Sequence, residues 1–335
     1  MNIKLAAVLV ITTVCLIWAL WGLELTAFLE VMSEVRWTQM FLVVVCYICG
    51  HTMRTLRLNL LLEKTVSFRG MFSVISIGFM AINVMPLRLG ELVRPYLLLE
   101  QHEVPFGASL AAVLLERLLD LAALAVLLLL LSFAVELPPN GIRVGDLDVV
   151  EAGQRFTGIV MALGVVALAG VLWMGQAIVQ RMQQLPAPAP AIGGLLDSFR
   201  QGLAQLIRRP VVALQAVFLT VVVWAFTLAA VRYALSAFPD LPATWAASLS
   251  TWSITMTGLL VAPTPGFFGT YEAFCKASLL LWGVDANLAA TFAVVLHMTM
   301  FLFSLALGGI FLVLEGLSLG RVVRASRKAH PESSP

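Results

Sequence analysis

Two short segments decide how this chain is interpreted: Pro86-Leu87-Arg88-Leu89-Gly90-Glu91 and Pro265-Gly266-Phe267-Phe268-Gly269-Thr270-Tyr271-Glu272. Each follows an apolar stretch, carries a Gly four residues after a Pro, and contains a Glu where hydrocarbon disfavours a charge. Pro and Gly interrupt helices, because Pro lacks a backbone donor and Gly adopts unusual backbone angles. Two interrupted helices in corresponding halves of a membrane chain indicate a binding site near the middle of the bilayer. The alternative is two unrelated helix kinks.

The composition sets the class of protein. Hydrophobic residues make up 60% of the 335 residues, charged residues make up 12%, and the mean hydropathy is +0.96. Soluble domains carry about 25% charged residues, so we expect an all-α polytopic membrane protein. The net charge of +2 indicates no nucleic-acid partner. The sequence contains no P-loop, zinc-protease or serine-hydrolase motif. The four cysteines lie in apolar stretches and are interpreted as packing residues, so we expect no metal and no cofactor.

Apolar runs and interrupted runs alternate along the chain. Six runs are long enough to cross a bilayer, at residues 4–23, 38–58, 107–135, 156–180, 211–235 and 287–316. Two further apolar regions, near 70–100 and near 244–283, are interrupted and are predicted to form re-entrant helical hairpins. The predicted breaks are at Pro86 and Gly90 in the first region and at Pro263, Pro265, Gly266 and Gly269 in the second.

The charges in the loops predict the topology. Basic residues gather after the second run, in the middle connector and in the tail: Arg54, Arg57, Lys64, Arg69, Arg181, Arg200, Arg208, Arg209, Arg321, Arg324, Arg327 and Lys328. Acidic residues dominate the other loops. By the positive-inside rule, both termini are cytoplasmic if each interrupted region returns to its own side. The first membrane half is then residues 1–136 and the second is residues 137–335, related by inverted topology.

The connector between the halves contains an alternation of Pro and Ala at 186–190, which predicts an extended stretch. Residues near 190–209 follow with apolar side chains at helical spacing. We expect an amphipathic helix that lies on the cytoplasmic membrane surface and acts as a hinge between the halves.

Arg88, Glu91 and Arg94 are spaced three apart on the second arm of the first hairpin, so a helix places them on one side. Arginine binds phosphate through a bidentate fork, and a half-helix N-terminus offers free backbone N–H groups to the same anion. We expect Arg88 and Arg94 to bind an anionic group, with Glu91 holding them in place. The alternative is an interfacial network whose side chains extend to the membrane surface.

Glu116, Arg117 and Asp120 occupy the third full span. Glu116 and Asp120 are four residues apart and stack on one helix face, so they need a cation such as Arg57, Arg88 or Arg94 nearby. A proton-coupled site and a structural salt-bridge network both remain open. Arg57, together with Arg54 one turn earlier, is a membrane-surface anchor by default and alternatively part of a vestibule for a headgroup.

Glu272 and Lys276 are an i, i+4 pair on the second arm of the second hairpin, which is predicted to neutralise itself. His297 stands alone on an apolar span and is interpreted as a packing residue, with a proton relay as the alternative.

Four ordered motifs resemble the lysylphosphatidylglycerol synthase transmembrane region family, whose members are also called flippase-like membrane proteins. They are Arg57, Pro86-x-Arg88-x-Gly90-Glu91-x-x-Arg94, Glu116-Arg117-x-x-Asp120 and Pro263-x-Pro265-Gly266-x-x-Gly269-x-x-Glu272. The resemblance spans nearly the whole chain. It implies a multi-pass protein of the bacterial inner membrane that moves a membrane lipid. Only fifteen residues follow Gly320, so we expect no aminoacyltransferase domain.

The sequence leaves three functions open. The first is a transporter or flippase for an anionic, phosphate-bearing lipid, with substrate contacts from the charged residues above. The second is a membrane-embedded lipid-modifying transferase that uses Glu116 or Asp120 as a general base. The third is an accessory subunit of a lipid or hopanoid pathway, which would bind an enzyme partner. The oligomeric state is not predicted.

Overall fold

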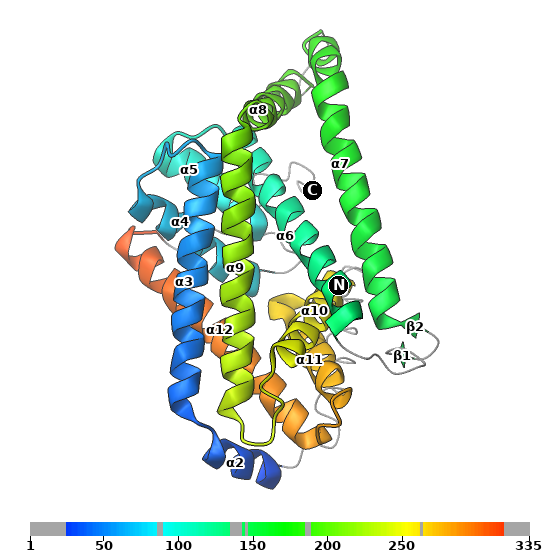
Figure 1. Ribbon diagram of the computed structural model, residues 1–335. Helices are drawn as coiled ribbons and strands as arrows, with labels where there is room; N and C mark the ends of the chain where they lie inside the picture. The colour runs from blue at the N-terminus through cyan, green and yellow to red at the C-terminus, as the bar shows by residue number, and fades with distance from the viewer. Residues whose placement is uncertain are drawn as a thin grey trace, which may run out of the picture.

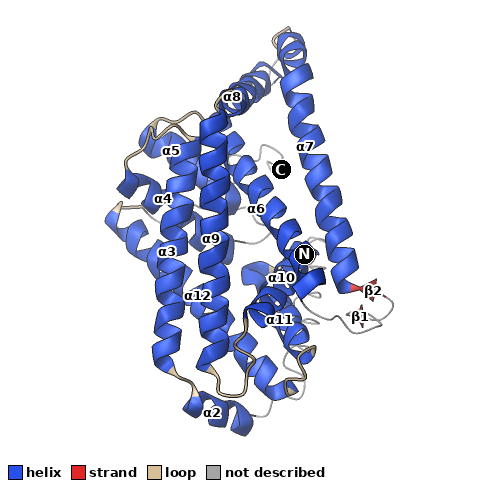
Figure 2. Cartoon of the chain, in the orientation of Figure 1, coloured by secondary structure: helices blue, strands red, loops and turns tan. Residues whose placement is uncertain are grey.

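The computed structural model describes residues 25–85, 90–134, 143–144, 147–184, 189–261 and 264–317 (Figure 1). Helices dominate these residues, and the strands among them are two residues long (Figure 2). The elements are α2 (Leu25–Glu34), α3 (Trp37–Leu61), α4 (Phe68–Val84), α5 (Val93–His102), α6 (Phe106–Ala134), β1 (Arg143–Val144), β2 (Leu147–Asp148), α7 (Val149–Met182), α8 (Ala189–Ile207), α9 (Pro210–Ala237), α10 (Trp245–Val261), η2 (Pro265–Phe267), α11 (Thr270–Leu280) and α12 (Ala286–Leu314).

The chain is an all-α polytopic membrane protein, as predicted. Within the described residues, four helical segments are long and apolar enough to cross a membrane: α3, α9, α12 and Val165–Met182 of α7. Helix α6 has 29 residues, roughly 43 Å at 1.5 Å per residue, but it carries three ionisable residues in its middle. The predicted first span, residues 4–23, lies outside the described residues.

Both interrupted regions fold back as helical hairpins at opposite ends of the bundle. The first hairpin consists of α4 and α5 and lies at the end that carries α8, whereas the second consists of α10, η2 and α11 and lies towards the end that carries α2 (Figure 1). Helices α3 and α9 run side by side between these two ends. The α8 end and the α2 end are named this way below.

Each hairpin has its own hydrophobic core. One cluster of buried side chains surrounds the first hairpin and includes Met71, Ile75 and Leu97. Another surrounds the second hairpin and includes Cys275, Leu279 and Phe292. Helix α4, the first helix of the first hairpin, packs on α12 of the predicted second half. Helix α10, the first helix of the second hairpin, packs on α6 of the predicted first half. The division into inverted halves remains a prediction.

Glycines let the turns of the hairpins approach other backbone closely. A Cβ atom on Gly90 would lie 2.3 Å from the backbone nitrogen of Ile82, so the first hairpin closes tightly on itself. Gly266 adopts φ 60°, and its Cβ would lie 3.1 Å from the carbonyl oxygen of Asn83 at the end of α4. The turn of the second hairpin therefore abuts the end of the first hairpin's first arm.

The prediction for the connector is partly wrong. Ala189 and Pro190 belong to the first turn of α8 instead of an extended stretch, because Pro is tolerated where a helix begins. The apolar side chains of Phe199 and Leu203 pack against α6 and α7. Helix α8 is thus docked on the bundle by its apolar face, although Ile192 and Leu195 stay exposed.

Candidate functional site

A network of ionised side chains lies inside the bundle, between α3, α5, α6 and α9. Its centre is Arg57 on α3, whose side chain is 0% exposed. Arg57 donates from Nε and Nη2 to Glu116 Oε1, at 3.2 and 3.1 Å, and from Nη1 and Nη2 to Asp120, at 2.8 and 3.2 Å. Its Nη1 also donates to Thr220 Oγ1 at 2.8 Å. A guanidinium has five N–H donors, so Arg57 has none left for a substrate.

Arg94 on α5 is held by two carboxylates. Its Nη1 lies 2.8 Å from Glu116 Oε2, and its Nη2 lies 2.7 Å from Glu91 Oε2. Glu116 therefore joins Arg57 to Arg94 through its two oxygens, which ties α3, α5 and α6 together. The Nε of Arg94 is buried and has no hydrogen-bond partner among the residues that the structure describes. Both ion pairs of Arg94 therefore use its terminal nitrogens and leave the N–H of Nε available as a donor.

Two further arginines adjoin this network. Arg117 is 36% exposed and lies 3.8 Å from Glu91 and 3.7 Å from Asp120. Arg54 is half-buried, and its guanidinium lies 5.5 Å from the centre of the Phe79 ring. Among the described residues, no carboxylate oxygen comes within 4.0 Å of it. The Arg94 guanidinium lies 5.7 Å from the centre of the same Phe79 ring, so two guanidinium groups approach one aromatic ring.

Local sequence explains this placement. Arg54 and Arg57 are three apart on α3, so both face the same neighbours. Gly78 on α4 makes room for Arg94, since a Cβ there would lie 2.3 Å from Arg94 Cγ. Trp224 on α9 donates from Nε1 to Asp120 Oδ1 at 3.3 Å. Side chains from five helices thus complete the network.

Several predicted residues come together here and others do not. Glu91, Arg94, Arg57, Glu116, Arg117 and Asp120 form one connected network. The prediction that the paired carboxylates need a cation is confirmed, with Arg57 between them. Arg57 is not a surface anchor, because it is fully buried. Arg88, Pro86 and Pro263 lie outside the described residues. The sequence interpretation missed Thr220 and Trp224, which are ordinary residues in an apolar run.

The second hairpin carries a smaller polar cluster. His297 Nδ1 on α12 lies 2.6 Å from Glu272 Oε1 on α11, and His297 Nε2 lies 3.0 Å from the carbonyl oxygen of Gly266. Glu272 Oε2 accepts a hydrogen bond from the backbone N–H of Gly269 at 2.7 Å. Both side chains are buried.

This cluster corrects two predictions. Glu272 uses its two oxygens for His297 and Gly269, so it does not form the expected self-neutralising pair with Lys276, whose side chain interacts electrostatically with Asp285. His297 is a polar partner instead of a packing residue. Its isolation on an apolar span was the signal that could have identified it, since a buried imidazole needs hydrogen-bond partners.

Comparisons with known proteins agree with this architecture. A family model described as the lysylphosphatidylglycerol synthase TM region matches residues 5–308. The chain belongs to this family. No curated protein and no solved structure matches the chain. Membership of the lysylphosphatidylglycerol synthase TM region family links the protein to membrane lipid metabolism or transport.

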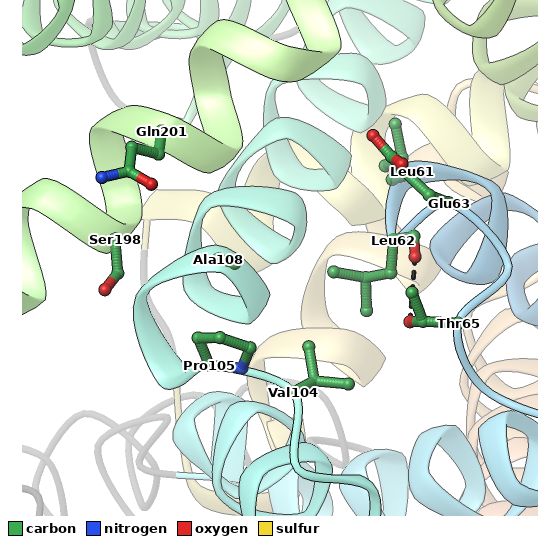
Figure 3. A pocket seen from close by; sticks show the side chains of 9 residues that line it. All are labelled: Leu61, Leu62, Glu63, Thr65, Val104, Pro105, Ala108, Ser198 and Gln201. Carbon is green, nitrogen blue, oxygen red and sulfur yellow. Dashed lines mark hydrogen bonds between the residues drawn. The ribbon is translucent and has the colours of Figure 1, made fainter.

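This family member also has a cavity at the α8 end, of about 350 Å³. It lies between the end of α3, the start of α6 and α8, and its lining includes Leu61, Pro105 and Ser198 (Figure 3). None of the network's ionised residues lines it. Within the described part of the chain, no group of His, Cys, Asp or Glu side chains is arranged to hold a metal ion, and Cys46, Cys49 and Cys275 are free thiols.

Proposed function

We propose that this protein binds the anionic headgroup of a phosphate-bearing membrane lipid and moves it across the bilayer. The observation that carries the proposal is the charge balance of the network. Among the described residues of the network, Arg54, Arg57, Arg94 and Arg117 supply four positive charges, and Glu91, Glu116 and Asp120 supply three negative ones, so the described positive charges exceed the negative ones by one. An uncompensated charge inside a membrane is costly, and a phosphodiester carries one negative charge.

The unused donors indicate where the phosphate would bind. Arg54 has no carboxylate within 4.0 Å among the described residues, and Arg94 Nε has no partner. Both guanidinium groups approach Phe79. A phosphate beside this ring would accept hydrogen bonds from Arg54 and Arg94 Nε. Arg57, with all five donors engaged, would hold the site together without touching the lipid.

Basic residues outside the network support an orientation of the protein in the membrane. Arg69, Arg208 and Arg209 lie at the α8 end, where α4 and α9 begin. The positive-inside rule supports a cytoplasmic location for this end, and in the proposal the headgroup site would then lie towards the cytoplasmic leaflet of a bacterial inner membrane. Both termini would then be cytoplasmic.

A lipid-modifying transferase is the second candidate. It requires a carboxylate that can accept a proton, but Glu116 already accepts hydrogen bonds at both oxygens and Asp120 is bonded to Arg57 and Trp224. A carboxylate stabilised in its ionised form by arginine is a weak general base. The ion pairing therefore favours transport over transferase chemistry.

The test is lipid translocation by the full-length protein in proteoliposomes that contain a fluorescent phosphatidylglycerol. The wild type is expected to accelerate movement between leaflets, and Arg54→Gln is expected to reduce the rate by about tenfold, equivalent to about 1.4 kcal/mol. Arg69→Gln is the matched control, because Arg69 is an exposed arginine in the first turn of α4. Equal rates for the wild type and Arg54→Gln would refute the assignment, and a chemically altered lipid would identify a transferase.

A further inference from the structure

We infer that Glu272 and His297 form a proton-binding site inside the membrane, and that loss of one proton from this pair releases the turn of the second hairpin. The side chains come from α11 and α12, and each is 4% exposed. The proposed function does not assign this pair a role. The inference that the pair governs lipid movement rests on that proposed function, whereas the proton site itself does not.

The hydrogen bonds fix how many protons the pair holds. The carbonyl oxygen of Gly266 can only accept, so His297 Nε2, at 3.0 Å, must carry a hydrogen. The contact of 2.6 Å between His297 Nδ1 and Glu272 Oε1 then needs one further hydrogen between the two atoms. That hydrogen resides either on the nitrogen, giving imidazolium and carboxylate, or on the oxygen, giving two neutral groups. Both arrangements have zero net charge and the same number of protons.

The pair also fastens the turn. Gly266 lies in η2 and Gly269 is the N-cap of α11, and these two backbone groups bind His297 and Glu272 respectively. Tyr271 stacks on the imidazole with ring centres 4.5 Å apart, and the Phe268 ring lies 5.1 Å from it. Two hydrogen bonds and two aromatic contacts thus hold the turn against α12, and a third hydrogen bond joins the turn to the start of α11.

Loss of the shared proton turns the hydrogen bond between Glu272 and His297 into a repulsive contact. The reaction takes the neutral pair to a Glu272 carboxylate and a neutral His297, and the proton passes to water. A carboxylate oxygen and an unprotonated Nδ1 then face each other with lone pairs on both atoms. At 2.6 Å in a low-dielectric interior this contact is repulsive, so the side chains separate. The same two residues bind Gly266 and Gly269, so their separation frees the turn.

Other titratable groups surround the pair without joining it. Tyr271 and Cys275 lie on α11, and Tyr47 on α3 interacts electrostatically with Tyr271. The Tyr271 hydroxyl donates to Met300 Sδ at 3.4 Å. Lys276 follows Glu272 by one turn, and Asp285 at the start of α12 is an electrostatic partner of Lys276. Among the described groups named here, none bridges Glu272 to His297.

A contact links the turn to the proposed headgroup site. Gly266 abuts the carbonyl oxygen of Asn83, and Asn83 donates from Nδ2 to the carbonyl oxygen of Phe79 one turn earlier. The guanidinium groups of Arg54 and Arg94 both lie near the Phe79 ring. Release of the turn therefore removes the contact between Gly266 and the end of α4, which lies beside the proposed phosphate site.

Hydrogen exchange of the full-length protein in lipid nanodiscs tests the proton site without a transport assay. The readout is the exchange rate of a peptide that spans Thr264–Glu272, measured by mass spectrometry over a series of pH values. Glu272→Gln is the matched control: its amide oxygen accepts from Gly269 and its NH₂ donates to His297 Nδ1, so the bonds persist without a removable proton. Dividing the wild-type rate by the control rate at each pH cancels the intrinsic pH dependence of exchange.

The expected ratio is flat at low pH and rises about tenfold per pH unit above the midpoint of the pair, as one released proton requires. Glu272→Ala is expected to exchange fast at every pH. A ratio that does not change with pH would overturn the inference, as would a control that opens together with the wild type. If Glu272→Gln does not fold, His297→Gln replaces it, because the amide can donate to the Glu272 carboxylate or accept from its protonated form, so loss of the proton does not make this contact repulsive.

The two proposals fail separately. A rising exchange ratio without lipid movement would leave the proton site standing and remove the transport function. Lipid movement with a flat ratio would retain the transport function and remove the proton site.

Discussion

The two hairpins are fastened to the helix that follows them in the same manner but with different chemistry. In the first, Arg94 on α5 binds Glu116 on α6, 22 residues later, at 2.8 Å. In the second, Glu272 on α11 binds His297 on α12, 25 residues later, at 2.6 Å. Arginine stays charged at any physiological pH, so the first fastening is permanent. The imidazole of His297 and the carboxylate of Glu272 share a proton that can leave, so in the inference above the second hairpin can be released.

This difference suggests a division of roles. The permanently ionised network holds the first hairpin, and among its described residues the positive charges exceed the negative ones by one, which is the excess that the proposed lipid anion would balance. The Glu272–His297 pair keeps the second hairpin closed only while its proton is present. Variants that remove charge, space or a single hydrogen bond from one hairpin at a time test this difference.

The largest effect is expected for Glu116→Gln. This change removes the anion that Arg57 and Arg94 share and leaves two buried guanidinium groups short of negative charge. Breaking a buried ion pair in this way costs about 3–5 kcal/mol, measured as the free energy of unfolding in detergent. The control is Glu63→Gln, which breaks an exposed pair with Arg209 at 3.2 Å and should cost less than about 1 kcal/mol. Equal losses would show that the network does not secure the first hairpin.

The close approach within the first hairpin gives the next effect. Gly90→Ala places a Cβ 2.3 Å from the backbone nitrogen of Ile82, which cannot move aside as a side chain would. We expect a loss of about 1–3 kcal/mol. Gly194→Ala on α8 is the control, because no atom lies within 4 Å of its Cβ position. Helix propensity predicts a gain of up to about 1 kcal/mol there. A tolerated Gly90→Ala would contradict the tight closure.

A smaller effect is expected for Thr220→Val on α9. The variant keeps the shape of the side chain but removes the hydroxyl that accepts from Arg57 Nη1 at 2.8 Å. We expect a loss of about 1–2 kcal/mol in the free energy of unfolding. Thr227→Val, on the same helix, is a matched control because Thr227 is also buried and donates to the carbonyl oxygen of Val223. A loss no larger than that of the control would mean that Arg57 needs no fifth partner.

The smallest effect on stability is expected for Glu272→Gln. The amide keeps both hydrogen bonds of the carboxyl group, and the imidazole can stay neutral, so the change should be within about 1 kcal/mol. Measuring it beside Glu116→Gln tests the comparison directly, since the substitution is chemically identical at the two hairpins. If Glu272→Gln loses as much stability as Glu116→Gln, the second fastening is also permanently ionic.

Much of the architecture could be predicted from the sequence. The boundaries of α3, α6, α9 and α12 lie within three residues of the predicted spans, because long apolar runs have few alternatives to a membrane helix. The two interruptions also occur where Pro and Gly predicted them. The connector was harder to predict, since an amphipathic face can bind lipid or protein equally well. Phe199 and Leu203 bind protein.

The candidate site could be predicted only in part. Ionisable residues in apolar runs stand out, which is why Glu116, Asp120 and Arg94 were identified. The sequence offered Arg57, Arg88 and Arg94 as alternative cations for the two carboxylates but did not choose among them, and it missed Thr220, because pairing depends on contacts between residues as far apart as Arg57 and Thr220. Arg54 and Arg57 look alike in the sequence. Arg57 has all its donors engaged, whereas Arg54 has no carboxylate within 4.0 Å among the described residues.

Hydropathy and backbone chemistry act locally, so the class of protein, the positions of the membrane helices and the two interruptions could be predicted from the order of the residues. Only the tertiary structure decided which charges neutralise one another, that Glu272 binds His297, and that Gly266 meets the end of α4. These results depend on distances between residues that are remote in the chain. In a low-dielectric interior such distances decide whether a charge is balanced, shared or left over.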